Sequence, residues 1–379
     1  MFSRIINFDN ALLTRSVFLF GARQTGKSTL LKQKFPDARY VNLLHADTFR
    51  ELSNTPEKLR QSLTPQEKLI IIDEVQKLPS LLDEVHAIIE QRKDLRFILT
   101  GSNARKLRRG GVNLLAGRAR THYLFPLTWP EIGPSYFEKQ ICFGSIPSIL
   151  LSDDPWSDLK EYVGVYLQEE IRAESITRSI EAFSRFLTVA GLSNGLQLNY
   201  SNIGNDAQVP PRTVREFFSI LEDTLIGFSL PAYRKTKTRK AISTAKFYFF
   251  DIGVAHALQG TKEVYAGTVS FGRAFEHLIA LEIRAFLSYK QMDIPFTYWR
   301  STSQLEVDFL LDDKVAIEVK GTGKVHERDT KGLCALKDDI PHLRRIIVCL
   351  ESERMLLSSG VEVIPLNEFL NDLWNGAII

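Results

Sequence analysis

The chain has 379 residues, of which 44% are hydrophobic and 25% are charged, with a formal net charge of +3. This length predicts two or three globular domains, and the near-neutral charge confines any nucleic-acid contact to a local patch. Apolar runs of about six residues fall short of the roughly 20 needed to span a membrane. We expect no signal peptide, because the first ten residues lack a charged head followed by an apolar run. Three scattered cysteines exclude a disulfide framework, so we expect a cytoplasmic protein without a membrane partner.

The first predicted strand covers residues 16–20 and runs into G-A-R-Q-T-G-K-S at residues 21–28, which opens a predicted helix that ends at Lys34. Strand, glycine-rich loop and helix in this order predict a phosphate-binding loop, because backbone N–H groups and the helix N-terminus point at negative charge. We expect Lys27 to reach the β- and γ-phosphates and the hydroxyl of Ser28 to bind Mg²⁺. The residues expected to hold the nucleotide in this segment are Gly21, Gln24, Thr25, Gly26, Lys27, Ser28 and Thr29.

The next strong signal is the apolar run of residues 69–72, which ends in Asp73 and Glu74. This pattern predicts a buried parallel strand that delivers two carboxylates at its C-terminal edge. We expect Asp73 to hold Mg²⁺ through water and Glu74 to orient or deprotonate the attacking water, which favours hydrolysis over passive nucleotide binding. The alternative is that Glu74 only begins the next turn.

A third predicted strand, residues 96–100, ends in G-S-N, where Ser102 or Asn103 is a candidate contact for the γ-phosphate or the attacking water. A simple turn is the alternative for these two residues. Farther along, L-A-G-R at residues 115–118 makes Arg118 a candidate arginine finger for a neighbouring subunit, with an ordinary surface residue as the alternative. The sequence contains no N-K-x-D motif, which removes the usual reason to choose guanine, so we expect ATP.

These motifs, together with F-P-L-T-W-P-E-I at residues 125–132, resemble the AAA-type ATPases of bacteria and archaea. More narrowly, they resemble the group that pairs such an ATPase with a C-terminal domain called DUF4143. The resemblance covers nearly the whole chain. It implies an AAA-type ATPase core and assembly into a homo-oligomer or ring, and it supplies no substrate.

The middle of the chain is predicted to be mostly helical as far as residue 185, for example with an apolar stripe over residues 159–171, which indicates a lid or connector. Two further helices follow, one capped by Ser201 and one opened by Pro211 or Arg212. A short turn between them is typical of a helix-turn-helix, and the stretch resembles a winged helix. The residues near the start of its recognition helix are Arg212, Thr213 and Arg215.

A run of basic residues follows at the position of the expected wing, with no acid between its first and last members. These residues are Arg234, Lys235, Lys237, Arg239, Lys240 and Lys246. Such a patch attracts phosphates and releases counterions, so nucleic acid is the expected partner, with DNA favoured. A solvated loop or a protein-binding wing is the alternative.

In the last third, a helix over residues 272–287 is predicted to precede three strands, a helix and a further strand, at residues 296–300, 305–310, 315–320, 327–338 and 345–350. Alternation in the third strand places Glu318 and Lys320 on one face. Antiparallel pairing of the second strand beside it would bring Asp308 to Glu318. Two carboxylates and a lysine in this arrangement can hold Mg²⁺, activate water and stabilise the transition state, and Glu276 is a third candidate ligand.

This order of elements, with Asp-x₉-Glu-x-Lys, looks like the PD-(D/E)xK nuclease fold, although Val307 stands where that motif has proline. The resemblance implies that Asp308 and Glu318 ligate a second Mg²⁺ or Mn²⁺, that Lys320 stabilises charge and that Glu276 is an auxiliary ligand. The alternative is a glutamate and a lysine that pair on a solvated strand face.

The expected fold class is therefore α/β: an AAA-type P-loop NTPase core, a winged-helix middle and a PD-(D/E)xK-like α/β C-terminal domain. The predicted domains are an ATPase core, a helical lid or connector, a winged helix and a nuclease-like domain, at residues 1–132, 133–185, 186–246 and 247–379. The predicted function couples ATP hydrolysis to nucleic-acid binding and metal-dependent phosphodiester cleavage. The alternative is an ATP-driven DNA- or protein-binding switch with a catalytically silent nuclease-like domain.

Overall fold

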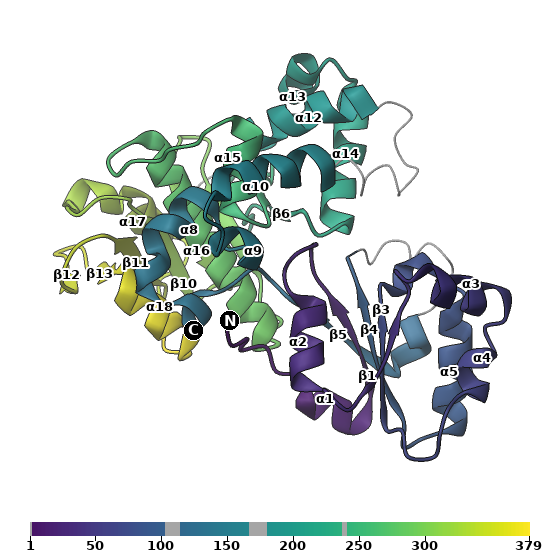
Figure 1. Cartoon of the computed structure of the whole chain (residues 1–379). Coiled ribbons are helices and arrows are strands. Elements are labelled where there is room, and N and C mark those ends of the chain that lie inside the picture. Colours follow the sequence, from purple (N-terminus) through teal and green to yellow (C-terminus); the bar gives the residue numbers. More distant parts are fainter. Residues whose placement is uncertain (1, 103–113, 167–179, 237–240) are drawn as a thin grey trace. The chain divides into compact units, whose positions relative to one another are not determined.

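The structure is a computed structural model that describes residues 2–102, 114–166, 180–236 and 241–379 (Figure 1). Internal contacts divide the chain into two compact units. The first unit contains residues 3–126 and 223–226, and the second contains residue 2 with residues 127–222 and 227–379. The expected mixed α/β class with a parallel sheet core is confirmed. The finer division into four domains stays a prediction.

The first unit is built on a five-stranded sheet in the order β2-β3-β4-β1-β5, and every pair of neighbours is parallel. The strands are β1 (Ser16–Phe20), β2 (Arg39–Asn42), β3 (Leu69–Asp73), β4 (Arg96–Gly101) and β5 (Ala119–Tyr123). The central strands are buried along almost their whole length, which explains why they appear in the sequence as continuous apolar runs. Parallel order places the carboxyl ends of all five strands at one edge of the sheet.

Helices cover both faces of this sheet, with α1 and α2 on one face and α3, α4 and α5 on the other (Figure 1). Their bounds are α1 (Asp9–Thr14), α2 (Lys27–Lys34), α3 (Ala46–Asn54), α4 (Lys58–Gln61) and α5 (Leu81–Gln91), with short 3₁₀ turns at Val75–Lys77 and Leu114–Gly117. The apolar stripe of α5, including Val85 and Ile88, packs against Ile70 and Ile72 of β3 in one buried cluster. The loops at the carboxyl edge are thereby attached to a rigid core.

The second unit begins with helices and a short hairpin. The elements before the hairpin are α7 (Trp129–Ile132), a 3₁₀ turn (Pro134–Tyr136), α8 (Phe137–Phe143), α9 (Pro147–Leu150), α10 (Pro155–Glu161), a π-helix (Tyr162–Tyr166), α12 (Ile180–Leu192), α13 (Tyr200–Ala207) and α14 (Pro211–Asp223). The hairpin pairs β6 (Gly227–Leu230) with β7 (Lys246–Phe249) in antiparallel fashion, and α15 (Ile252–Gln259) follows it.

The two helices predicted around the turn are present, and Pro211 opens the second as expected. The predicted cap is wrong by two positions: the side chain of Asn199 accepts the N–H of Asn202, and Ser201 lies inside the first turn of α13. Asparagine and serine are comparable caps, so the sequence alone gave little reason to prefer one. Part of the stripe expected over residues 159–171 lies outside the described residues.

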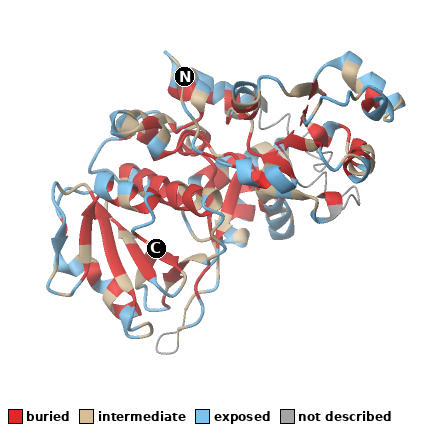
Figure 2. Cartoon of the chain, turned by 90° about the horizontal axis from the view of Figure 1, so that it is seen from below, coloured by how far each residue is buried: buried red, intermediate tan, exposed pale blue. Residues whose placement is uncertain are grey.

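The remainder of the second unit is a six-stranded mixed sheet in the order β12-β13-β11-β10-β9-β8, with β9 antiparallel to both of its neighbours. The elements are α16 (Val269–Tyr289), β8 (Phe296–Arg300), β9 (Glu306–Leu311), β10 (Val315–Val319), a 3₁₀ turn (Glu327–Thr330), α17 (Lys331–Lys337), β11 (Arg344–Cys349), β12 (Met355–Leu356), β13 (Glu362–Pro365) and α18 (Leu366–Trp374). Figure 2 shows its central strands largely in the colour of buried residues. Among the helices of the described ranges, none has the length and apolarity to traverse a bilayer.

Candidate functional site

The loop between β1 and α2 wraps tightly enough to need glycine at two positions. Gly26 has a φ of +91°, a left-handed conformation that glycine adopts without strain. At Gly21, an added Cβ would lie 2.4 Å from the carbonyl oxygen of Leu124, so only glycine fits beside that backbone. The N-terminus of α2 then begins at Lys27, directly after the loop.

The side chain of Lys27 is buried inside this loop. Its ammonium donates hydrogen bonds to the carbonyls of Gly21 at 2.8 Å and Ala22 at 3.0 Å. The hydroxyl of Thr25 also donates to Ala22, at 2.9 Å. A positive charge and a helix N-terminus are thus gathered at one place, and both favour phosphate binding.

The carboxylate of Asp73 accepts hydrogen bonds from hydroxyl groups on three different elements. Ser28 donates from α2 at 2.7 Å, and the hydroxyls of Tyr40 on β2 and Thr100 on β4 also donate to it. The structure therefore brings Ser28 and Asp73 together, whereas Tyr40 and Thr100 were not anticipated. A hydroxyl and a carboxylate in direct contact are oxygen ligands of the kind Mg²⁺ takes, so these residues fit the predicted magnesium site.

Burial, and then the hydrogen bond to Asp73, raise the pKa of Tyr40 above its usual range. The phenol therefore stays protonated at neutral pH and acts as a donor. No motif marks Tyr40 in the sequence. Its position follows from the pairing of β2 beside β3, in which Asn42 lies opposite Asp73.

Glu74 follows the strand with a left-handed backbone, at a φ of +61°. Its N–H donates to the hydroxyl of Thr100 at 3.1 Å, and its carboxylate accepts the side-chain amide of Gln76. The same amide nitrogen lies 3.1 Å from the hydroxyl of Ser102. Non-glycine residues in this conformation cost about 1–2 kcal/mol and cluster at functional sites. Asn103, the other candidate here, lies outside the described residues.

Arg118 lies at the opposite edge of the sheet from the phosphate-binding loop. Its carbonyl accepts the N–H of Ser16, the first residue of β1, whereas the loop follows the last residue of that strand. Its guanidinium forms an ion pair with Glu90 on α5, and hydrogen bonds from Lys93 and Arg118 lower the pKa of Glu90. The role of Arg118 as a finger for a neighbouring subunit stays a prediction.

A further arginine, which no sequence motif marks, forms hydrogen bonds that stabilise the phosphate-binding loop. The guanidinium of Arg4 donates to the carbonyl of Thr25 at 2.6 Å and to the carbonyl of Phe125 at 2.6 Å. It therefore ties the phosphate-binding loop to the segment that follows β5.

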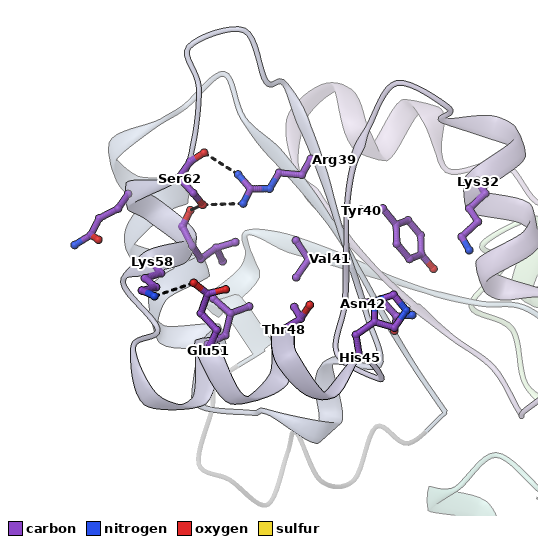
Figure 3. Close-up of a pocket in the computed structure, with 13 residues that line it drawn as sticks. Lys32, Arg39, Tyr40, Val41, Asn42, His45, Thr48, Glu51, Lys58 and Ser62 are labelled. Atoms are coloured by element: carbon purple, nitrogen blue, oxygen red, sulfur yellow. Dashed lines mark hydrogen bonds and ion pairs between the residues drawn. The ribbon is translucent and has the colours of Figure 1, made fainter.

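A pocket of about 540 Å³ opens beside the edge strand β2, between it and helices α3 and α4 (Figure 3). Two interactions join residues that line the pocket. Lys58 forms an ion pair with Glu51 at 2.8 Å, and the guanidinium of Arg39 donates hydrogen bonds to Ser62. Tyr40 forms another part of the wall. Its hydroxyl reaches Asp73, so this pocket adjoins the candidate magnesium ligands.

In the second unit, the antiparallel register of β9 and β10 places Asp308 beside Glu318, the neighbourhood that the sequence predicted. The N–H of Val319 donates to Asp308 Oδ2 at 2.8 Å, and Lys320 Nζ lies 2.7 Å from Glu318 Oε1. Burial, and then the charge of Glu318, raise the pKa of Asp308 well above its usual value. Burial raises the pKa of Glu318 to about 7. Their roles as metal ligands stay predictions.

Lys246 does not lie in the exposed basic patch where the sequence placed it, so that expectation is wrong. It is the first residue of β7, and its side chain is 5% exposed. Its ammonium lies 2.9 Å from Glu276 Oε1, 2.7 Å from Glu306 Oε1 and 3.9 Å from Asp308 Oδ1. These carboxylates supply the charge that makes burial of the lysine favourable, and they are distant from it in sequence.

Of the other patch residues, Arg234 and Lys235 are exposed, and Lys235 lies 3.5 Å from Asp313. The remaining members, Lys237, Arg239 and Lys240, lie outside the described residues. Near the start of α14, Arg212 and Arg215 are exposed, and Thr213 is half-buried. The guanidinium of Arg215 lies 5.0 Å from the ring centre of Tyr200.

Comparison with known families assigns three consecutive segments. Residues 14–133 match an AAA domain, residues 135–265 match DUF8612, a domain of unknown function, and residues 271–369 match DUF4143, also a domain of unknown function. The AAA match contains the phosphate-binding loop, Asp73 and Glu74. The DUF4143 match contains the cluster around Asp308, with the exception of Lys246.

Two curated relatives align along most of the chain, and both are named only as uncharacterized proteins. One, from Haemophilus influenzae, is 21% identical and covers 92% of each chain. The other, from Methanocaldococcus jannaschii, is 22% identical over 93% of this chain and 84% of the relative.

Among solved structures, a Pif1 helicase from Candida albicans aligns at 15% identity with a TM-score of 0.23, over 41% of this chain and 46% of the helicase. The chain thus spans about half the length of that helicase. Because the score is low, the fold assignment rests on the sheet topology and the AAA match. The chain is therefore a P-loop protein with an AAA domain and a C-terminal DUF4143 domain, as its motifs predicted.

Proposed function

We propose that the chain hydrolyses ATP in the presence of Mg²⁺ at the loop of residues 21–28. The observation that carries this proposal is the contact of Ser28 with Asp73 at the edge of the sheet, directly beside Glu74. Hydrolysis requires a held phosphate chain, a magnesium site and a group that orients water, and the AAA family supports ATP as the nucleotide.

Each residue has a distinct task in this proposal. Lys27 and the backbone N–H groups of the loop bind the phosphates, while Ser28 and Asp73 hold the hydrated magnesium ion, which neutralises developing charge. Glu74 orients the attacking water and accepts its proton, and Gln76 fixes the direction of that carboxylate. The developing charge on the γ-phosphate is stabilised by the ammonium of Lys27.

Two substitutions test the assignment. Lys27→Ala is expected to abolish phosphate release, and Glu74→Gln is expected to bind ATP but to hydrolyse it at least about a hundredfold more slowly, as loss of a general base predicts. The matched control is Lys68→Ala, which removes an exposed lysine paired with Asp94. Wild-type turnover by the Glu74 variant would show that another group directs the water.

Nucleotide turnover is proposed to drive binding of nucleic acid, DNA by preference, through the start of α14 and the adjacent basic residues. Arg212 and Arg215 are exposed there, and exposed arginines at a helix N-terminus are suited to contact phosphates and base edges. A protein partner is the other outcome. The substitution pair Arg212→Ala and Arg215→Ala should weaken DNA binding and reduce the slope of log affinity against log salt by about 2.

Fluorescence anisotropy of labelled DNA across a salt series measures this slope. The control is Lys314→Ala with Lys331→Ala, which removes the same charge elsewhere in the second unit. An unchanged slope in the arginine variant, with ATP hydrolysis intact, would assign α14 to a protein partner. Metal-dependent cleavage by the C-terminal domain and a catalytically silent C-terminal domain are the two forms that this proposal can take.

A further inference from the structure

Four carboxylates lie close together in the second unit, three of them around Lys246 and the fourth paired with Lys320. They come from three elements that are distant in sequence: Glu276 on α16, Glu306 and Asp308 on β9, and Glu318 on β10. Their side chains are between 12% and 25% exposed. So much negative charge in a buried place requires compensation, because an unpaired buried charge costs several kcal/mol.

Lys246 provides that compensation for three of the carboxylates, and Lys320 provides it for Glu318. The oxygens of Glu276 and Glu306 lie 2.9 Å and 2.7 Å from its ammonium nitrogen. These are the separations of an ammonium–carboxylate pair. The ammonium of Lys246 therefore occupies the space between these two carboxylates.

Other donors also contact the carboxylates of the cluster. Tyr248 donates to the same oxygen of Glu276 at 2.6 Å, and Arg300 lies 3.0 Å from the second oxygen of Glu306. The N–H of Val319 donates to Asp308 Oδ2. Of the atoms in this cluster, Glu318 Oε2 has no hydrogen-bond partner within the described part of the chain.

The backbone holds Lys246 in this position. Its residue pairs with Leu230 in the antiparallel hairpin and forms an isolated bridge with Gln197 on its other side. The ammonium also lies 5.3 Å from the ring centre of Tyr298. The ammonium of Lys246 could therefore leave the cluster only if its side chain adopted another conformation among buried residues or if the hairpin moved.

We infer that Lys246 supplies, from within the chain, the positive charge that a divalent cation supplies in the nuclease fold this domain resembles. The residues present do not fit that metal. Within the described residues, no set of three or more carboxylate, histidine or cysteine side chains is arranged to hold one. The C-terminal domain is accordingly an ion-paired binding domain that takes no catalytic metal and cleaves no phosphodiester bond. The inference is independent of ATP hydrolysis in the first unit.

Manganese binding to the nucleotide-free full chain tests the inference, with free Mn²⁺ measured by electron paramagnetic resonance. Wild type and Asp308→Asn should bind the same amount, because the cluster takes no ion in either. Lys246→Met should gain about one bound Mn²⁺ per chain, and Lys246→Met combined with Asp308→Asn should lose that gain. ATP hydrolysis should be unchanged in all of these variants, which separates this test from that of the proposed function.

Two results would overturn the inference. One is a Mn²⁺ ion bound by wild type and lost in Asp308→Asn, or cleavage of labelled single- or double-stranded DNA by wild type that Asp308→Ala abolishes. The other is a Lys246→Met protein with wild-type circular dichroism that gains no ion, since the lysine would then not stand in a cation's place. The first comparison needs no change at Lys246, so it decides the question even where that substitution prevents folding.

Discussion

The hydroxyl of Tyr40 donates a hydrogen bond to the carboxylate of Asp73, so an edge strand of the sheet contacts the proposed magnesium site. The ammonium of Lys32 lies 5.1 Å from the ring centre of the same tyrosine. Tyr40 therefore lies between the pocket beside β2 and the nucleotide site. A molecule that binds in that pocket would contact a residue that positions the magnesium aspartate.

Replacing Tyr40 by phenylalanine removes this donor and leaves the ring in place. We expect kcat for ATP hydrolysis to fall about tenfold, the value of one hydrogen bond to a charged group, and the Mg²⁺ concentration for half-maximal rate to rise. Steady-state phosphate release across a Mg²⁺ series measures both. Tyr265→Phe, at an exposed tyrosine, is the control. Equal Mg²⁺ dependence in Tyr40→Phe and wild type would show that Asp73 needs no positioning by β2.

Gln76→Leu removes the amide that holds the carboxylate of Glu74. We expect kcat to fall about tenfold or more because the carboxylate then turns freely, while the affinity for ATP stays unchanged. Phosphate release and equilibrium binding of a fluorescent ATP analogue separate the two quantities. Gln91→Leu, at the exposed end of α5, is the matched control. A loss of nucleotide affinity instead of kcat would place Gln76 in the support of the loop rather than in the orientation of Glu74.

Arg4→Gln removes the guanidinium that joins the carbonyls of Thr25 and Phe125. The phosphate-binding loop then loses a brace, so we expect the Kd for ATP to rise about tenfold, the equivalent of roughly 1.4 kcal/mol. Isothermal titration of ATP against wild type, Arg4→Gln and the exposed control Arg15→Gln measures the change. An unaltered Kd would mean that the loop holds its shape through its own glycines and the buried Lys27.

A pH dependence is expected from Glu282, a buried residue of α16 that accepts the backbone N–H of Trp129 at 2.9 Å and the indole N–H of Trp374 at 2.8 Å. Burial raises its pKa from 4.5 to about 8. Between these values the folded chain keeps a proton that the unfolded chain releases. The unfolding free energy therefore falls as pH rises through this window, by about 1.4 kcal/mol per pH unit.

The comparison of wild type with Glu282→Gln isolates this term, because the glutamine variant has no group to titrate there. Urea unfolding between pH 5 and about 8 should show wild type losing stability relative to the variant as pH rises. A stability difference that stays constant with pH would mean that Glu282 titrates alike in the folded and unfolded chain.

Local patterns in the sequence predicted the elements that carry the sites. The strands around Phe18, Ile71 and Leu99 were placed to within a residue, because a buried parallel strand appears as an unbroken apolar run. The meeting of Asp308 with Glu318 was predicted on the condition that their strands pair antiparallel, as they do. Both inferences depend on spacing along the chain, which a sequence displays directly.

The residues that escaped prediction act across distant segments. Tyr40 and Arg4 contact the nucleotide site by hydrogen bonds from distant positions in the sequence. Gln76 contacts its near neighbour Glu74, and no spacing rule marks any of the three. Lys246 was placed in a solvated basic run because its neighbours in sequence are basic. Its carboxylate partners lie at least 30 residues farther along the chain, and a charge pattern read in sequence does not show which lysine turns inward.

The position of Lys246 has a consequence for where this C-terminal domain can be cut. The DUF4143 match begins at residue 271, and the boundary predicted from the sequence lies between residues 246 and 247. A fragment that starts at either point keeps the four acidic side chains but lacks Lys246, which pairs with three of them. Such a fragment would fold poorly at neutral pH and gain stability on addition of the missing hairpin. The autonomous folding unit is thus larger than the family match, because its ionic centre is assembled from both sides of the boundary.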